Sequence, residues 1–512
     1  KLPNDNVVVF ATADDRPQGA LNIPSISGPT ITVAPHPADE RFKILYILGR
    51  DAAELRTAAT ALALGRIALA GQTVTVGKLE DLKKRKPYDA PRWVPSDRPV
   101  KFGELATIED LNVRGLTPDL VRINLTTPPD LFAWRSAGAP FDLKFRYTPR
   151  PKQDKSNLNV LVNQNYITSF PLLAYPGAAA PDSTLSHWLA KLGPDDMFPV
   201  QEKFHLPVNQ LRARSQMQFH FSFDYPKEGS CRDVVLDNVR GAIDPDSELD
   251  ISKFPHYLKM PNLSAFANTG FPFTRMADLS ETAVVMPDNY TAGDIGTYLT
   301  LMGRMGESTG LPVYGVSVTR SADVKQHADK DILLVGGPGN QPLLRDWAGD
   351  MPFSADGAFR MFSLSDWQHK LMPWYDAPKR NEAPVANLTA QTLAKDAVLF
   401  GFESPLKSGR SVVALTADRT SGQADVLNAL MDADVVAKIQ GGVSVVRGKD
   451  VEAYEVDNGY YVGSLPPLMA IRWGLANQSW IASLLIVLVA TMLAGVLYTV
   501  LRRQAQRRIT GK

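Results

Sequence analysis

Alternating apolar and polar residues mark the middle of the chain. The stretches 141–147 (FDLKFRY) and 217–225 (MQFHFSFDY) place apolar residues at odd positions and polar residues at even positions. This period of two is typical of strands with one face in a core and the other in water. Two further runs, 158–162 and 166–167, flank the polar turn Asn163-Gln164-Asn165 and predict a hairpin. We therefore predict an antiparallel β domain, a sandwich or jelly roll, over residues 96–265.

The regions on either side show short, continuously apolar strands that alternate with helical patterns. In the first region we predict strands over 7–10, 42–48 and 73–76, and a helix over 51–64 with Asp51 as candidate cap and Gly65 at its end. In the second region we predict strands over 282–286, 313–318, 331–336, 411–416 and 443–446, and helices over 294–305 and 425–433. This order predicts β-α-β units and two α/β domains. The Pro- and Lys-rich stretch 83–99 is a predicted linker, and 349–397 a predicted long insertion.

The longest apolar run lies near the C-terminus, from Trp480 to Leu501, and its 22 residues include no charge. At about 1.5 Å per residue, this run crosses a hydrocarbon core of about 30 Å. Residues 502–512 carry four arginines and Lys512, and no acid. Because basic residues beside a membrane helix stay in the cytoplasm, we predict residues 1–479 on the other face of the membrane.

The segment just before this run has the pattern of an amphipathic helix. Leu468, Ile471 and Leu475 fall on one side, with Trp473 beside them, and polar or small residues take the opposite side. We predict an interfacial helix within residues 463–479; a plain extension of the membrane helix is the alternative. Tryptophans favour the membrane surface, and small residues allow close helix packing in lipid. The predicted membrane and partner interface consists of Leu468, Ile471, Trp473, Leu475, Trp480 and Gly495.

Composition limits the classes of function. The chain has 512 residues, 44% of them hydrophobic and 21% charged, which is typical of a folded multidomain protein. Its net charge of +1 argues against nucleic-acid binding over a large surface. Cys231 is the single cysteine, so a large exported body must rest on packed cores and not on internal disulfides. The chain begins KLPNDNVVVF, without a signal peptide, and we expect that an upstream region precedes it.

No catalytic or metal-binding motif stands out. The Gly-rich stretch 336–340 (GGPGN) lacks the Lys-Ser/Thr of a phosphate-binding loop, and no G-x-S-x-G or H-E-x-x-H is present. We therefore predict neither catalytic nor metal-binding residues. Trp93, Trp134 and Trp188 lie in or beside the β region and are candidate carbohydrate-stacking residues, with core or interdomain packing as the alternative.

The order of these parts resembles the B subunit of bacterial cellulose synthase, the BcsB family. The residues that carry the resemblance are the hairpin 158–172, the helix-bearing stretch 46–64 and the closing segment 465–503. The resemblance implies flavodoxin-like α/β domains that flank a carbohydrate-binding-like jelly roll in the periplasm. The family begins with another jelly roll, which agrees with the expected upstream region.

The resemblance also implies the function. Family members are non-catalytic and partner the membrane glycosyltransferase that polymerises glucose from UDP-glucose. The implied partners are this catalytic subunit, the nascent β-glucan and the inner membrane; homo-oligomerisation stays open, and nucleic acid is not expected. No cofactor is expected, and cyclic di-GMP is expected to act through the partner subunit. The alternative is a membrane-tethered enzyme that modifies polysaccharide.

We therefore predict a single-pass protein of the bacterial inner membrane with most of the chain in the periplasm. The predicted divisions are 1–95 (flavodoxin-like α/β), 96–265 (jelly roll), 266–462 (second flavodoxin-like α/β), 463–479 (interfacial helix), 480–501 (transmembrane helix) and 502–512 (cytoplasmic basic tail).

Overall fold

A computed structural model describes most of the chain. The described residues are 5–16, 23, 25–65, 70–77, 85–148, 155–173, 197–224, 239–352, 396–417, 420–456, 459–477 and 479–509. Internal contacts divide the chain into two units. Unit 1 joins residues 1–95 to 260–460, and unit 2 joins 96–259 to 461–512. The chain therefore leaves unit 1, forms most of unit 2, and returns.

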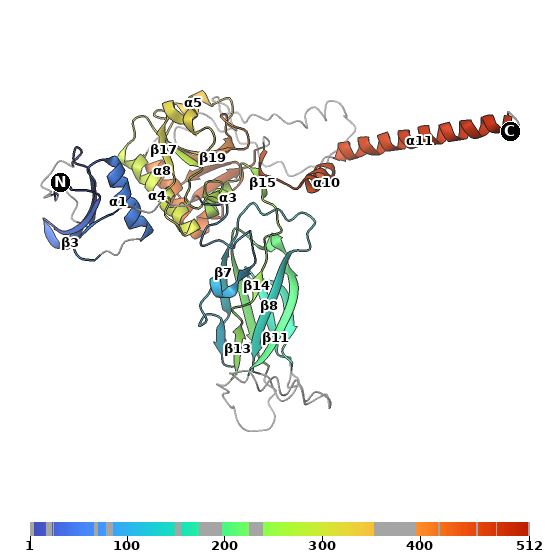
Figure 1. Ribbon diagram of the computed structural model, residues 1–512, viewed down its shortest axis with the longest axis horizontal. Helices are drawn as coiled ribbons and strands as arrows, with labels where there is room; N and C mark the ends of the chain where they lie inside the picture. The colour runs from blue at the N-terminus through green and yellow to red at the C-terminus, as the bar shows by residue number, and fades with distance from the viewer. Residues whose placement is uncertain are drawn as a thin grey trace, which may run out of the picture. The chain divides into compact units, whose positions relative to one another are not determined.

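The first α/β domain is a four-stranded mixed sheet in the order β1-β3-β2-β4, with a helix on one face (Figure 1). Its elements are β1 (Val7–Ala11), β2 (Thr30–His36), β3 (Asp39–Leu48), α1 (Ala52–Leu64) and β4 (Thr73–Thr75). β1 and β3 pair in parallel, whereas β2 pairs antiparallel with both β3 and β4. Strand β2 did not emerge from the sequence. Because β2 lies between them, β3 and β4 are not neighbours, as a simple β-α-β unit would require.

Helix α1 begins and ends as its sequence predicts. The side chain of Asp51 accepts a hydrogen bond from the backbone N–H of Glu54 at 2.9 Å, and Gly65 ends the helix with a left-handed backbone. Ala58 and Ala61 pack on the sheet. A Cβ on Gly49 would lie 2.2 Å from the backbone nitrogen of Leu55, so glycine is required where the helix crosses the end of β3.

Residues 85–95 are not the solvated linker that their composition predicts. The backbone N–H of Tyr88 donates to the carbonyl of Arg275, and that of Arg92 donates to the carbonyl of Thr309. The Pro-rich sequence therefore supplies a rigid strap that packs on residues of the second α/β domain, inside unit 1.

The β domain is a sandwich of two antiparallel sheets. One sheet has the order β10-β9-β12-β7; the other has the order β5-β14-β8-β13-β6, with β11 also paired to β8. The strands are β5 (Val100–Lys101), β6 (Asn112–Arg114), β7 (Val121–Thr126), β8 (Ala139–Tyr147), β9 (Asn157–Val162), β10 (Asn165–Pro171), β11 (Phe198–Leu206), β12 (Arg214–Ser222), β13 (Arg240–Ile243) and β14 (Glu248–Leu249). Short helices η1 (Phe102–Glu104) and η2 (Val208–Gln210) join them.

The two alternating stretches are confirmed as strands β8 and β12, and their apolar sides face each other. Phe102 contacts both Phe141 of β8 and Phe219 of β12, with ring centroids 5.4 and 5.7 Å apart. Gly241 leaves space for the ring of Phe221, which a Cβ would meet at 2.7 Å. The predicted hairpin is confirmed as β9–β10; Asn163 and Gln164 form its turn with φ of 51° and 68°.

The second α/β domain is a seven-stranded sheet in the order β17-β16-β18-β20-β19-β21-β22. Pairing is parallel from β17 to β20 and antiparallel from β20 to β22. The strands are β16 (Thr282–Met286), β17 (Ser317–Arg320), β18 (Asp331–Val335), β19 (Ala397–Glu403), β20 (Ser411–Thr416), β21 (Val443–Arg447) and β22 (Asp450–Tyr454). The helices are α3 (Leu263–Thr269), η3 (Phe273–Arg275), α4 (Ala292–Thr309), η4 (Ser321–His327), α5 (Leu343–Asp346), α8 (Thr420–Met431) and α9 (Ala433–Val436).

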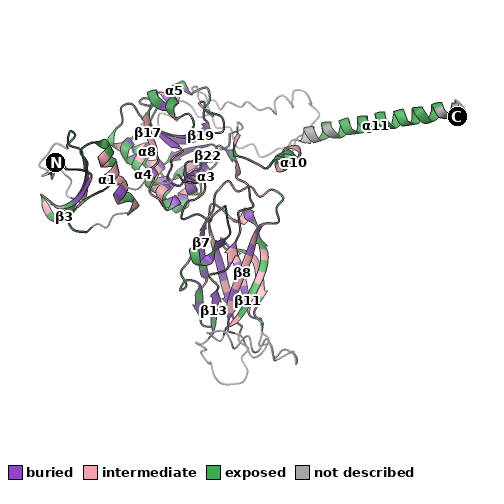
Figure 2. Cartoon of the chain, viewed as in Figure 1, coloured by how far each residue is buried: buried purple, intermediate pink, exposed green. Residues whose placement is uncertain are grey.

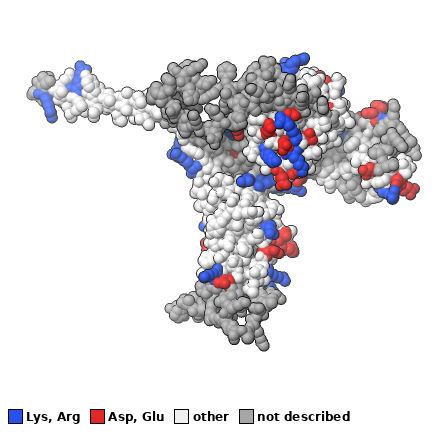
Figure 3. Space-filling view, turned by 180° about the vertical axis from the view of Figure 1, so that it is seen from behind, with Lys and Arg blue, Asp and Glu red and all other residues white. Residues whose placement is uncertain are grey.

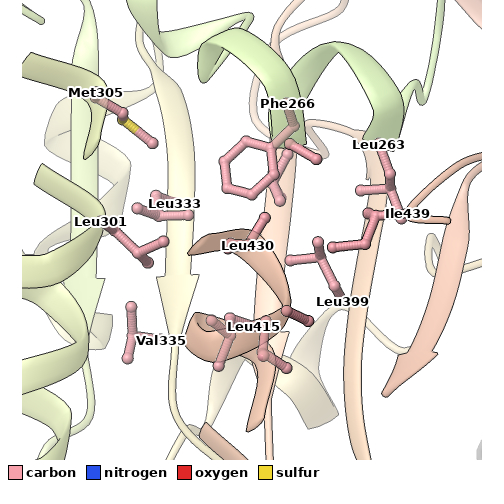
Figure 4. Packing of buried hydrophobic residues seen from close by; sticks show 14 of the residues in the cluster. Leu263, Phe266, Leu301, Met305, Leu333, Val335, Leu399, Leu415, Leu430 and Ile439 are labelled. Atoms are coloured by element: carbon pink, nitrogen blue, oxygen red, sulfur yellow. The ribbon is translucent and has the colours of Figure 1, made fainter. Parts of the chain in front are cut away.

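Apolar cores lie on both faces of this sheet. Side chains of α3, α4 and α8 pack on Leu333, Leu399 and Leu415 (Figure 4). On the other face, Trp347 and Leu343 lie with Phe400. Strands covered on both sides are continuously apolar, which is why β16, β18 and β20 were predictable. Strand β19 was not predicted, and most of the predicted insertion 349–397 lies outside the described residues.

The predicted strand 313–318 was placed too early. Val313 and Val316 pack on the core from a loop, and the strand starts at Ser317. Apolar residues that anchor a loop cannot be told from strand residues by hydrophobicity alone.

A partly buried charge cluster, in which only Asp331 is fully buried, lies at one end of the parallel strands. Arg275 and Arg410 each contact both Glu281 and Asp331, with Arg410 Nη1 at 2.9 and 3.2 Å from their carboxylate oxygens. Burial alone would raise the pKa of Glu281, but the hydrogen bond from Arg410 and the two guanidinium charges hold it below its ordinary value. Because two cations balance two anions, the cluster is accounted for by a structural role and does not require a ligand.

Candidate membrane and partner interface

A two-stranded ribbon leads from the folded units to the C-terminal helices. It pairs β15 (Tyr257–Met260) with β23 (Tyr460–Gly463). At its end, Gly463 has φ of 88°, and a Cβ there would lie 2.1 Å from the carbonyl oxygen of His256. The backbone N–H of Ser464 donates to that same carbonyl, and His256 Nδ1 lies 2.9 Å from the buried carboxylate of Asp130. These contacts within unit 2 fix the direction in which the chain leaves the ribbon.

Helix α10 (Pro467–Asn477) belongs to unit 2, and Trp473 holds it on the rest of that unit. The indole makes edge-on contacts with the rings of Phe132, Tyr257 and Tyr461, at centroid distances of 6.0, 5.4 and 5.2 Å. Tyr257 and Tyr461 stack on each other at 4.8 Å. Burial, and then the neighbouring Tyr461, raise the pKa of Tyr257. Each aromatic contact of this kind contributes about 0.5–1.5 kcal/mol beyond its buried area.

The predicted apolar side of α10 is divided in the structure. Leu468 and Ile471 are 74% and 59% exposed, whereas Trp473 and Leu475 are half-buried. Trp473 lies about 140° around the helix from Leu468, at about 100° per residue. The helix therefore contacts the rest of unit 2 through Trp473, whereas Leu468 and Ile471 are exposed. Sequence reasoning placed Trp473 at the membrane surface; the structure places its ring in the aromatic cluster.

Helix α11 (Ser479–Ile509) continues from α10 and contains the predicted span. Residues Ile486–Gln506 form a helix long and apolar enough to cross a membrane, and none of it is buried among the described residues. Figure 2 shows the described part of α11 exposed along its length, and Figure 3 shows Lys and Arg only near its far end. At about 1.5 Å per residue, 31 residues extend about 46 Å, beyond a hydrocarbon core of about 30 Å.

Two of the predicted interface residues, Trp480 and Gly495, belong to α11. Position 480 lies in α11, but the side chain of Trp480 lies outside what the structure describes. At Gly495 a Cβ would meet nothing within 4 Å, so the surface there is open.

Of the predicted carbohydrate-binding tryptophans, Trp93 belongs to a core. It is 3% exposed, and its Nε1–H donates to the carbonyl of Ser308 at 3.1 Å. Its ring packs with Ala90 and Ala277, in unit 1 and not in the β domain. A ring so placed offers no face to a sugar.

The other two tryptophans differ. Trp134 is half-buried, with the guanidinium of Arg135 4.7 Å from its ring centroid. Its role as a sugar contact stays a prediction. Trp188 and Cys231 lie outside the described residues. Within the described residues, no three His, Cys, Asp or Glu side chains gather as a metal-binding group.

Three family models match the chain in succession. They are described as the first FD domain (residues 1–76), the second CBM domain (99–248) and the second FD domain (256–415) of cellulose synthase BcsB. The chain belongs to the BcsB family. The division into mixed α/β and all-β domains fits this assignment, and the resemblance noted from the sequence is confirmed.

Individual BcsB relatives match nearly the whole chain. The "Cyclic di-GMP-binding protein" of Pseudomonas fluorescens is 40% identical over 98% of this chain, and that of Escherichia coli K12 is 34% identical over 99%. The chain spans 66% and 65% of those proteins. "Cellulose synthase 2" of Novacetimonas hansenii is 35% identical over 94% of this chain, which corresponds to 30% of that protein. This chain thus also resembles part of a longer polypeptide that is named as a synthase.

Proposed function

We propose that the chain is a non-catalytic, membrane-anchored subunit of a cellulose synthase that binds and activates the catalytic glycosyltransferase subunit through α10 and α11. The observation that carries this proposal is the exposed apolar surface of the C-terminal segment. Leu468 and Ile471 are exposed, and so is the apolar part of α11 from Ile486 to Gln506. Similarity to part of a longer synthase chain supports a synthase as the partner.

The remainder of the chain lies in the periplasm and helps to guide the nascent β-glucan. Support for the location comes from the arginines that follow the apolar run, since such residues stay in the cytoplasm. Support for contact with glucan comes from the match of residues 99–248 to a family model described as a CBM domain. The jelly-roll and flavodoxin-like topologies belong to the same proposal.

Cyclic di-GMP acts through the catalytic partner and not through this chain, although the relatives are named for binding it. In the proposed topology, residues 502–512 are the part of this sequence that lies in the cytoplasm. Arg502, Arg503 and Arg508 are exposed on the end of a single helix. One helix offers charge but no concave pocket, and a dinucleotide site needs convergent groups.

The central experiment replaces residues 468–501 with an unrelated single membrane span in the full chain. We expect the variant to reach the membrane in normal amount, but to lose co-purification with the glycosyltransferase and UDP-glucose-dependent polymer synthesis. The control replaces only Lys407 with Ala, an exposed position in unit 1, and should keep both co-purification and synthesis. Full synthesis with the unrelated span would show that the segment is only an anchor.

Two further readouts use the same purified chains. Titration of cyclic di-GMP into the isolated chain is expected to show no saturable binding, whereas the complex binds it. An assay for glucan cleavage or deacetylation is expected to show none. Binding by the isolated chain, or either activity, would contradict the corresponding part of the proposal.

A further inference from the structure

The two outer faces of the β sandwich differ in chemistry. On the six-stranded sheet, Asp142 accepts hydrogen bonds from Gln201 at 2.8 and 2.9 Å, and Lys203 lies 3.8 Å away. Lys101 pairs with Asp246 beside this sheet at 2.7 Å. This is an ordinary solvated face in which opposite charges alternate.

The four-stranded sheet β10-β9-β12-β7 has a different outer face. Its four strands contain no Asp or Glu. Alternate residues such as Leu158, Val160 and Phe219 are fully buried, so the residues between them point outward. The side chains on this side of the sheet include five amides and one exposed aromatic ring. We call this surface the amide face; it consists of Asn124, Asn157, Asn159, Gln216, Gln218 and Tyr166, and among these Gln218 is buried, at 7% exposed.

Strand register aligns these groups across the sheet. Tyr166 of β10 lies opposite Leu161 of β9, which lies opposite Gln218 of β12, which lies opposite Arg122 of β7. The next row of β9 and β12 pairs Asn159 with His220. An aromatic ring at one edge is thus followed by the apolar Leu161 and then by the polar Gln218 and Arg122 along the same row.

Three of the amide side chains are joined to one another by hydrogen bonds. Gln218 Nε2 donates to Gln216 Oε1 at 2.7 Å, and Gln216 Nε2 donates to Asn124 Oδ1 at 3.1 Å. This chain of bonds sets which end of each amide donates and which accepts before any ligand arrives. Ordering these side chains in advance lowers the entropic cost of binding.

We propose that the amide face binds the β-glucan chain, with the ring of Tyr166 stacked on a glucose unit. A glucan is neutral and rich in hydroxyl groups, and each hydroxyl both donates and accepts. Asn and Gln do the same, whereas carboxylates only accept and are costly to desolvate without a cation. Tyr166 is 63% exposed and can offer its ring face to the apolar side of a sugar. This inference rests on the glucan-guiding part of the proposed function and names its site.

The test measures depletion of the full chain, purified in detergent, by suspended amorphous cellulose. We expect Tyr166→Ala to weaken binding about two- to tenfold, as loss of one aromatic contact predicts, and Tyr166→Phe to retain it. Asn159→Ala should also weaken binding. The matched control is Gln201→Ala on the opposite outer face, which should bind like the parent chain. Since Tyr166 is mostly exposed, its variants should unfold at the parent's temperature.

Each outcome is decisive. If the parent chain binds cellulose and Tyr166→Ala and Asn159→Ala bind equally well, this inference fails while glucan guiding stands. If the parent chain does not bind cellulose at all, glucan guiding fails together with this site, whereas the role of α10 and α11 is judged separately by polymer synthesis. If the variants change the mass of the chain in solution but not cellulose binding, the face is an interface between copies, and the inference is overturned.

Discussion

Single residues decide how the C-terminal segment is attached. Trp473 makes ring contacts with residues that lie at positions 132, 257 and 461, so it joins segments distant in sequence. An indole can hold three rings at once because it is large and its edge and face carry opposite partial charges. Trp473 thus anchors α10 to the rest of unit 2, and the exposed Leu468 and Ile471 are available to contact a partner or the membrane.

Gly463 offers a test of this attachment. We expect Gly463→Ala to destabilise the β15–β23 ribbon by about 2–3 kcal/mol, because its φ of 88° is strained for alanine and the new Cβ would meet the carbonyl of His256. Hydrogen exchange of the ribbon amides should then accelerate by about thirtyfold or more. Gly448→Ala is the matched control: its φ is 61°, with nothing within 4 Å of a Cβ. It should cost only about 1 kcal/mol. Equal effects at the two positions would show that the contact with His256 does not matter.

Among elements, those with one periodic face were the most predictable. Strands β8 and β12 followed from alternation, and α11 followed from its length and lack of charge. Strand β2 was missed because Pro35 and His36 at its end resemble a loop. The amphipathic pattern of α10 gave the helix but not which apolar residues would be covered. That choice depends on Phe132 and Tyr257, whose positions only the tertiary fold provides.

Helix α11 carries the next prediction. We expect Gly495→Ile to weaken association with the glycosyltransferase by about 1–3 kcal/mol, the usual cost of overpacking a close contact. The chain itself should be undisturbed, since nothing lies within 4 Å of the position and isoleucine inserts well into membranes. The measurement is the dissociation constant of the purified complex in detergent.

The control for this variant is Leu493→Ile, which introduces the same residue about 160° around the helix. Leu493 is also exposed. It should leave affinity unchanged. Equal affinity of the Gly495→Ile and parent chains would place the partner on a different side of α11.

At the scale of the whole molecule, the order of domains along the chain is not their grouping in space. The sequence predicts successive domains over 1–95, 96–265 and 266–462. In the structure, residues 1–95 form one unit with residues 260–460. The strap around Trp93 lies within this unit and donates a hydrogen bond from the indole to Ser308. Composition cannot reveal this, because a Pro-rich strap and a Pro-rich linker look alike until their hydrogen-bond partners are known.

The orientation of the entire chain rests on a few charges. Arg502, Arg503, Arg507 and Arg508 follow the apolar run within seven residues, which is close enough for basic residues to set topology.

The proposed orientation is tested by cysteine labelling after Cys231→Ser removes the native thiol. One variant carries Lys407→Cys, an exposed position in unit 1, and another carries a single cysteine added after Lys512. With a maleimide that cannot cross the inner membrane, Lys407→Cys should react in cells with a permeabilised outer membrane. The C-terminal cysteine should react only after detergent lysis. Labelling of the C-terminal cysteine before lysis would reverse the orientation and would place the amide face in the cytoplasm, on the wrong side for an exported glucan.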